Sequence, residues 1–245
     1  MRIDELAPAI EASMLACVMD IGCDLPSSIQ AAESSEKYDF IYAAVGFHPA
    51  EIGGMDNEAL DTIKKLAARP KVKAIGEIGL DYYWDDNPPR PAQRDAFAAQ
   101  IELAKELKLP ICIHSRDAVQ DTLDVLRACK AFESIPVLMH CYSYSVETAR
   151  ELLDLGCMFS LGGPVTYKNA KKTVDVARML PLGRLLIETD SPYLSPVPFR
   201  GKMNTPLNVE YVARKIAEIK ELSFEEVAIS TMNNALKFYG ITAEF

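Results

Sequence analysis

Residues Val72 to Asp81 read VKAIGEIGLD, an apolar run that carries a single carboxylate, Glu77, between two glycines. A short apolar run of this kind predicts a buried β-strand. After Gly79 the chain continues into the polar and aromatic run DYYWDDNPPRP. We therefore expect a buried strand whose carboxyl end reaches the protein surface and places the carboxylate of Glu77 there.

Three later segments repeat this design, because each is an apolar run with a polar residue at its carboxyl end. They are PICIHSRD (Pro110–Asp117) with His114, PVLMHC (Pro136–Cys141) with His140, and RLLIETDSP (Arg184–Pro192) with Asp190. The remainder of the chain is expected to be the scaffold that holds these four strand ends.

Apolar runs and amphipathic segments alternate along the whole chain. The runs predict strands over Ala16–Cys23, Phe40–Pro49, Val72–Asp81, Pro110–Asp117, Pro136–Cys141, Cys157–Gly163 and Arg184–Asp190. Helical spacing predicts helices over Met1–Ala16, Asp24–Lys37, Asn57–Arg69, Pro91–Lys108, Asp117–Lys130, Ser145–Leu155, Lys168–Leu180, Leu207–Glu221 and Ser223–Tyr239. Either Asp24 or Ser27 is a candidate cap for the second of these helices, and Asp117 is one for the fifth.

Strands made of continuous apolar residues, with helices between them, are typical of a parallel sheet covered on its outer face. We predict an α/β fold, a (β/α)8 barrel of the TIM type, in one domain over residues 1–245. The alternative is an open doubly wound sheet, which normally has a Gly-rich phosphate loop that this sequence lacks. Seven strands are readable and the chain begins with a helix, so we expect the first barrel strand to be missing.

Composition limits the classes of partner and the compartment. The formal net charge is −9, and proteins that bind nucleic acid along a broad surface are usually basic, so any such contact must be local. No apolar run approaches the ~18 residues of a membrane span, and the acidic start is unlike a signal peptide. Six cysteines without a CxxC pattern predict reduced thiols and a cytoplasmic protein; the oligomeric state stays open.

Glu77, His114, His140 and Asp190 are the residues that we expect to carry chemistry. Carboxylate and imidazole ligands suit zinc, manganese or magnesium. Their spacing matches no local metal motif, so the prediction depends on the shared position at the mouth of a barrel. A bound metal lowers the pKa of water, and Asp190, at the end of the last predicted strand, is then placed to accept the proton as a general base.

Several further residues are candidates for substrate contacts or support. His48 ends the second strand in GFHP, and Arg116 follows His114 by two and is suited to binding an anion. The alternatives are a loop histidine bonded to backbone, and a salt bridge from Arg116 to Asp81 or Asp117. Glu188, two residues before Asp190, either orients a ligand or is a structural carboxylate.

Two loops add local candidates. Tyr82, Tyr83 and Trp84 are suited to stacking on a base, or else they pack under a lid. In the loop after the seventh strand, Arg200, Lys202 and Asn204 offer local positive charge and polar contacts; the alternative is a plain solvated loop.

Five segments together resemble the TatD family of metal-dependent deoxyribonucleases, which is similar to the amidohydrolase barrels. They are GEIGLDYY, HSRDA, HCYS, ETDSPYL and FRGKMNTP. The resemblance covers nearly the whole chain and implies a divalent-metal phosphodiesterase that acts on DNA ends, with 3′→5′ exonuclease activity. It also implies that Glu77 bridges two metals, that His114 and His140 bind one of them, and that Asp190 binds the other and acts as base. His48 matches the GxHP histidine of the family near the substrate.

One element of the family pattern is absent. The family opens with a strand that carries a metal-binding His-x-His pair, and this sequence has no histidine before His48. Either the given start lies downstream of the natural one, which we favour, or the protein is naturally short and has lost one metal subsite. Two other functions stay open: an amide or ester hydrolase that uses the same site, such as a deacylase, and a non-catalytic truncated barrel.

Overall fold

A computed structural model describes residues 3–242. These residues divide into two compact units, one made of residues 17–139 and 239–241 and the other of residues 3–16, 140–238 and 242. Each unit is described by itself. No helix within residues 3–242 has the length and apolar character needed to cross a membrane.

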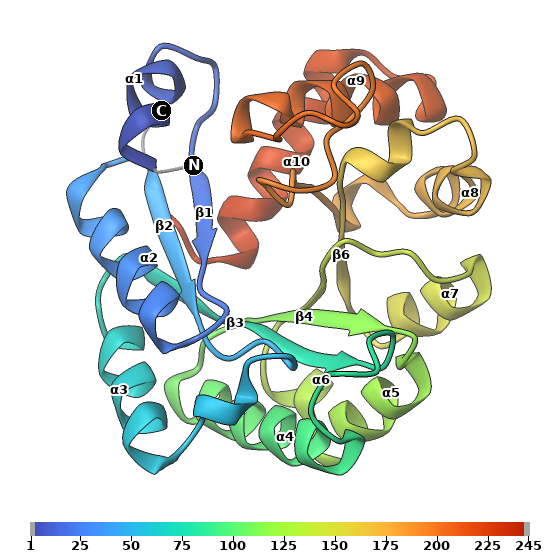
Figure 1. The fold of residues 1–245 in the computed structure, drawn as a ribbon. Helices are drawn as coiled ribbons and strands as arrows, with labels where there is room; N and C mark the ends of the chain where they lie inside the picture. The colour runs from blue at the N-terminus through green and yellow to red at the C-terminus, as the bar shows by residue number, and fades with distance from the viewer. Residues whose placement is uncertain (1–2, 243–245) are drawn as a thin grey trace. The chain divides into compact units, whose positions relative to one another are not determined.

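The unit of residues 17–139 is built on five parallel strands that pair in chain order (Figure 1). They are β1 (Val18–Ile21), β2 (Ile41–Val45), β3 (Val72–Asp81), β4 (Ile111–Arg116) and β5 (Val137–Met139). Its helices are α2 (Leu25–Lys37), α3 (Asn57–Ala67), α4 (Arg90–Leu107), α5 (Val119–Ala128) and α6 (Ala131–Ser134), with a 3-10 turn, η1, over Ile52–Gly54. Figure 1 shows α2 beside β1 and β2, and α4 lying along β3. α3 packs against α2, β2 and β3.

The longest strand, β3, has its predicted bounds and is nearly all buried. Its pairing with β4 shifts between Ile75 and Ile78, so that one extra residue is accommodated around Glu77. Such bulges bend a strand and redirect a side chain, and they are common beside active sites. Beyond the bulge, Gly79 has φ +143, and a Cβ there would lie 1.9 Å from the carbonyl oxygen of His114. Glycine therefore permits the close approach of β3 to β4 at this point.

The other unit contains two parallel strands and most of the C-terminal helices. Its elements are α1 (Ile3–Glu11), α7 (Val146–Asp154), β6 (Met158–Leu161), α8 (Lys171–Met179), β7 (Leu185–Ile187), α9 (Val209–Lys220) and α10 (Phe224–Phe238), with 3-10 turns η2 (Gly163–Thr166), η3 (Leu182–Arg184) and η4 (Pro206–Asn208). α10 packs against β7 and α9. The side-chain amide of Asn234 donates to the carbonyls of Leu182 and Leu185, at 2.8 and 2.7 Å, and so fixes α10 to the start of β7.

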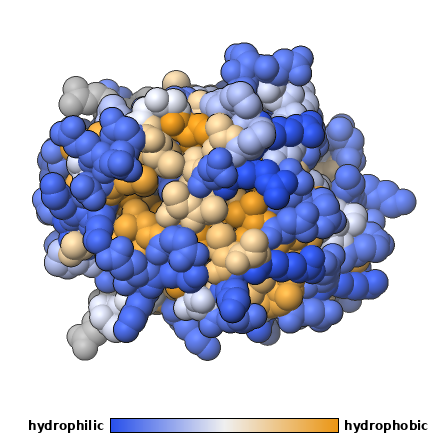
Figure 2. All heavy atoms as spheres, turned by 90° about the horizontal axis from the view of Figure 1, so that it is seen from below, coloured by the Kyte–Doolittle hydropathy of each residue, from blue (hydrophilic) through white to orange (hydrophobic). Residues whose placement is uncertain are grey.

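The cores of both units consist of strand residues and of the inward faces of helices. Phe47, Phe97 and Ile101 are among the fully buried side chains of the first unit, and Phe159 and Ile216 among those of the second. In Figure 2, which views the molecule from below, hydrophilic residues cover most of the surface and hydrophobic residues are visible between them. All six cysteines are free thiols, as predicted.

The structure corrects several expected boundaries. α1 ends at Glu11, and Met14, expected on its apolar face, is 87% exposed; Met1 and Arg2 lie outside the described residues. Asp117 does not cap the helix after β4, because it adopts φ 51 and the position before α5 is Ala118. β7 stops at Ile187, so Glu188 and Asp190 lie in the loop that follows it. The short helix α6 was not predicted.

Candidate metal-binding site

His114 lies between two carboxylates in the unit of residues 17–139. Its Nδ1 is 2.8 Å from Oε1 of Glu77, and its Nε2 is 2.9 Å from Oδ2 of Asp81. Glu77 and Asp81 come from β3 and are four residues apart, which places both side chains on one face of that strand. The structure therefore brings together Glu77 and His114 as predicted, and adds Asp81, which the sequence analysis considered only as a salt-bridge partner of Arg116.

Asp81 is almost fully buried and is held as a carboxylate. Burial acts to raise its pKa, but hydrogen bonds from His114 and from the backbone N–H of Tyr83, with the charges of His114 and Arg116, bring the pKa below its usual value. A carboxylate that accepts a hydrogen bond from one ring nitrogen of a histidine fixes the ring orientation and raises the basicity of the other nitrogen. Asp81 is thus arranged to support His114 as a ligand.

His48 follows β2 and faces the same cluster. The backbone N–H of Ala50 donates to its Nδ1 at 3.1 Å, so the neutral ring carries its proton on Nε2. That nitrogen lies 3.9 Å from Oε1 of Glu77, and the rings of His48 and His114 meet edge to face at 4.4 Å between centroids. One ligand atom from each of His48, Asp81 and His114 can be chosen so that all three lie within 4.8 Å of one another.

Two buried glutamines of α4 hold the strand ends that carry this cluster. The amide of Gln93 accepts from the N–H of Asp81 at 2.9 Å and donates to the carbonyl of Asp81 at 3.0 Å. Gln100 does the same for Phe47, the residue before His48, at 2.7 and 3.1 Å. The two glutamines are seven residues apart, so they lie on one face of the helix. A helix packed outside the strands thereby sets the backbone at two site positions.

In the other unit, His140 and Glu188 form a second imidazole–carboxylate pair. Nδ1 of His140 is 3.4 Å from Oε2 of Glu188, and that oxygen also accepts a hydrogen bond from the hydroxyl of Ser160 in β6. Burial acts to raise the pKa of Glu188, but the charge of His140 and the hydrogen bonds from His140 and Ser160 bring it below its usual value. Oε1 of Glu188 is buried and has no hydrogen-bond partner within residues 3–242.

Asp190 and Cys141 adopt left-handed backbone conformations in the loops that follow β7 and β5. Their φ angles are 55° and 43°. Asp adopts this region more readily than most residues other than glycine, whereas Cys seldom does. Such conformations persist where the surroundings hold them and cluster at functional sites. Burial, the charge of Glu188 and further contacts raise the pKa of the Cys141 thiol well above its usual value, so this cysteine stays protonated.

Asn204 holds the loop that contains Asp190. It is fully buried, and its side-chain amide donates to the carbonyls of Thr189 and Tyr193, both at 2.7 Å. Its Oδ1 accepts from the backbone N–H of Thr205 and from Asn208, both at 2.9 Å. These bonds use the whole amide, so we replace the predicted substrate contact of Asn204 with a role in fixing this loop.

The two predicted arginines each lie over an aromatic ring. The guanidinium of Arg116 is 3.7 Å from the ring centroid of Tyr83, and that of Arg200 is 4.3 Å from the ring centroid of Tyr167. Both arginines are exposed at the surface of their unit. They keep their positive charge available to an anionic ligand while their planes rest on aromatic faces.

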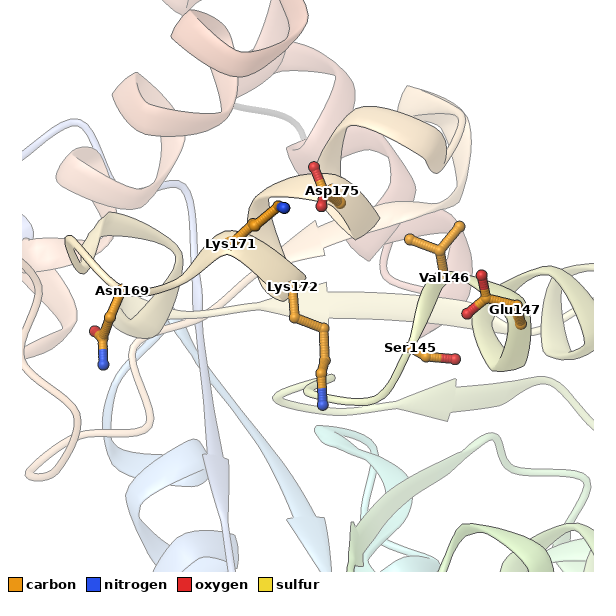
Figure 3. Close-up of a pocket in the computed structure, with 7 residues that line it drawn as sticks. All are labelled: Ser145, Val146, Glu147, Asn169, Lys171, Lys172 and Asp175. Carbon is orange, nitrogen blue, oxygen red and sulfur yellow. The ribbon is translucent and has the colours of Figure 1, made fainter.

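A groove of about 500 Å³ lies elsewhere, between the first turns of α7 and α8 (Figure 3). Two lysines and two acids line it, so it has no excess charge of either sign; its lining residues are Ser145, Val146, Glu147, Asn169, Lys171, Lys172 and Asp175. None of the predicted site residues is among them. The groove therefore does not coincide with the chemistry that the strand ends present.

The side chains at the strand ends fit divalent metal ions. Imidazole nitrogen with carboxylate oxygen is a donor set for zinc, manganese or magnesium. An unsatisfied buried acceptor such as Oε1 of Glu188 costs roughly 1–3 kcal/mol. A bound cation at that oxygen would remove this cost, because it supplies the positive partner that the protein does not.

Comparison with known proteins identifies the family of this chain. The family model described as TatD related DNase matches residues 2–240. The chain belongs to this TatD family. The metal-dependent hydrolase YabD of Bacillus subtilis is 47% identical over 98% of this chain and 93% of its own length. YcfH of Escherichia coli, also named a metal-dependent hydrolase, is 39% identical over 98% of this chain and 89% of its own length.

Solved structures confirm the predicted fold class. The crystal structure of the TatD homologue YJJV from Escherichia coli matches with a TM-score of 0.89 and 29% identity, over 98% of this chain and 93% of that one. A TatD family hydrolase from Entamoeba histolytica matches with a TM-score of 0.88 at 22% identity and supports the fold alone. This TatD family member is thus an α/β protein of the TIM-barrel type and a metal-dependent hydrolase.

Glu188 was a candidate for orienting a ligand, whereas the supporting contacts of Asp81, Gln93, Gln100 and Ser160 were not predicted, although signals exist for the first three of these four residues. Asp81 follows Glu77 by an even number of residues on a strand, which places both on one face. Gln93 and Gln100 interrupt the apolar face of α4 with a spacing of seven. Ser160 has no such signal, because a serine in an apolar strand is not distinctive.

Proposed function

We propose that this TatD family hydrolase cleaves phosphodiester bonds at the ends of DNA strands, removing nucleotides in the 3′→5′ direction. The observation that carries the proposal is the pairing, in each unit, of a histidine with a carboxylate at the carboxyl end of a strand: His114 with Glu77, and His140 with Glu188. The name of the matching family, which is a DNase, supports DNA as the substrate.

Each pair is proposed to take part in holding a divalent metal ion. In barrels of the TIM type, catalytic residues come from the carboxyl ends of several different strands and meet at one face. Glu77, His114, His140 and Asp190 occupy such ends in this chain. In the unit of residues 17–139, Glu77 and His114 would hold a metal from β3 and β4. In the other unit, His140 and Asp190 are proposed as metal ligands from the ends of β5 and β7. Zinc, manganese and magnesium all suit this donor set.

A divalent metal bound there supplies Lewis-acid stabilisation of phosphate charge and makes water a stronger nucleophile. The carboxylate of Asp190 accepts the proton from the attacking water as general base. Nε2–H of His48 offers a hydrogen bond to a phosphate oxygen, and the guanidinium of Arg200 supplies positive charge for an anionic substrate. Asp81 and Glu188 keep His114 and His140 in place while this occurs.

Hydrolysis of a single-stranded oligodeoxynucleotide labelled at its 5′ end tests the proposal. After removal of metal with a chelator, readdition of Mg²⁺, Mn²⁺ or Zn²⁺ should restore a ladder of products shortened from the 3′ end. Asp190→Asn should lower kcat by about 10²-fold or more, as expected for loss of a general base. Asp154→Asn, at an exposed position of α7, is the matched control and should leave the rate unchanged.

Acyl substrates distinguish the competing reaction class. Cleavage of 4-nitrophenyl acetate or of an N-acyl amino acid by the metal-loaded protein, without cleavage of DNA, would replace the nuclease with a deacylase. Cleavage of neither class would favour a non-catalytic barrel. We place the reaction in the cytoplasm, because six free thiols suit a reducing compartment.

A further inference from the structure

Two large aromatic side chains stand exposed directly after the end of β3. The side chains of Tyr83 and Trp84 are 49% and 54% exposed, and their rings meet edge to face at 4.7 Å between centroids. The guanidinium of Arg116 lies 3.7 Å from the centroid of Tyr83 and 5.5 Å from that of Trp84. A contiguous exposed apolar patch often marks a surface that contacts a ligand or a partner.

Tyr82, the residue between Asp81 and this pair, has a different role. Its hydroxyl donates to Oδ2 of Asp121 at 2.7 Å, and the guanidinium of Arg90 covers its ring at 4.3 Å. Tyr82 thus anchors the segment to α4 and α5 and is not available for stacking. The anchoring leaves Tyr83 and Trp84 as the two rings that face solvent.

The exposed pair is continuous with the proposed centre. The backbone N–H of Tyr83 donates to Oδ1 of Asp81, whose other oxygen contacts His114. Arg116 and His114 are two residues apart on β4 and therefore project to the same side, about 7 Å apart along the strand. That separation is within the length of one nucleotide.

We propose that Tyr83, Trp84 and Arg116 form a stacking platform for an unpaired nucleobase at the end of a single-stranded nucleic acid. The platform deepens the proposed function and rests on it for its substrate class. Aromatic faces and a guanidinium plane bind any base by stacking, without reading its sequence.

Local charge favours a base over the phosphate backbone at this place. Asp85 and Asp86 follow Trp84 directly and are exposed, so they repel phosphate groups. The chain as a whole carries a net charge of −9 and cannot hold a long polyanion by electrostatics. Stacking of a neutral ring is the contact that these surroundings permit.

Trp84 reports on the platform directly, because it is the only tryptophan in the chain. Its fluorescence is titrated with a short oligodeoxythymidylate, and with the same oligonucleotide whose terminal residue lacks the base. The intact strand should quench the fluorescence, and removal of one terminal base should weaken binding by about 5- to 150-fold. Equal titration curves for the two strands, or no quenching by either, would overturn the platform.

Variants separate stacking from folding. Tyr83→Ala should raise the KM for the intact strand in the same range and leave the KM for the strand without its terminal base unchanged, whereas Tyr83→Phe should behave as wild type. Arg116→Lys keeps the charge but loses the planar face, so it should also raise the KM for the intact strand. A rise for both strands alike would contradict the base contact.

The fluorescence titration, together with the cleavage assay on the same two strands, separates this proposal from the nuclease proposal. If base-dependent quenching occurs without cleavage, the platform stands and the nuclease proposal fails. If both strands are cleaved with the same KM, the nuclease stands and the platform fails.

Discussion

Replacement of Gly79 by alanine is predicted to damage both stability and metal binding. Gly79 lies between Glu77 and Asp81 on β3, and a Cβ there would be 1.9 Å from the carbonyl oxygen of His114, where real Cβ atoms do not come within 3.0 Å. The backbones of β3 and β4 must therefore separate by about 1 Å at the point where Glu77 and Asp81 hold His114.

The energetic cost has two sources. A φ of +143° is essentially restricted to glycine and costs an alanine roughly 1–3 kcal/mol. Forcing a methyl group into a close-packed contact costs roughly another 1–3 kcal/mol. For a chain of this length each kcal/mol lowers the melting temperature by about 2–4 °C, so we expect Gly79→Ala to lower it by roughly 4–24 °C.

Thermal unfolding followed by circular dichroism and a titration with Mn²⁺ measure the two effects. Gly53→Ala is the matched control in the same unit, because a Cβ at Gly53 meets nothing within 4 Å. The control should melt and bind metal as the wild type does. A Gly79→Ala protein with wild-type melting temperature and wild-type Mn²⁺ affinity would refute the claim that this close approach positions His114.

Gln100→Leu leaves the buried N–H and carbonyl of Phe47 without partners and should lower the free energy of unfolding by roughly 2–5 kcal/mol, measured in urea. An unchanged free energy of unfolding would show that the two hydrogen bonds between Gln100 and the backbone of Phe47 are dispensable. Asn204→Asp keeps the shape but loses the donors that hold the loop of Asp190, so kcat should fall by at least 10-fold with a smaller change in KM; a change in KM alone would contradict this positioning role. Burial raises the pKa of the Cys157 thiol to about 12, so a thiol reagent at pH 8 should modify Cys157 only after unfolding, and rapid labelling of it in the folded protein would be inconsistent with the structure.

The sequence was sufficient to predict the strands because their signal is local. A continuous apolar run bounded by glycine, proline or charge specifies a buried strand without reference to the rest of the chain, and β3 has its predicted bounds. Helix caps were less predictable. Asp24 caps α2 as expected, accepting from the N–H of Ser27 at 2.8 Å, whereas Asp117 takes a left-handed turn instead. Both aspartates precede a helix, and the backbone conformation of the preceding chain decides which of them caps it.

The sequence indicates which polar residues lie at the strand ends, and the structure brings Glu77 and His114 together, but most of the contacts that support them were not predicted. A polar residue at the end of an apolar run can be recognised from the sequence alone. Because the carboxyl ends of barrel strands share one face, Glu77 and His114 could be expected to lie close together. The side-chain amides of Gln93, Gln100 and Asn204 form hydrogen bonds with backbone groups 11 to 53 residues away in the sequence. No local sequence pattern predicts which backbone group each amide will contact. Asn204 was therefore taken for a substrate contact, although its amide is used within its own loop.

The most direct test of the account is the number of divalent ions bound per chain, measured by calorimetric titration with Mn²⁺ after chelation. The wild type and the Asp154→Asn control are predicted to bind at least one ion per chain. His114→Ala in one unit and His140→Ala in the other are each predicted to weaken or abolish metal binding. Absence of binding by the wild type, or wild-type binding by both histidine variants, would contradict a metal centre built from these strand ends.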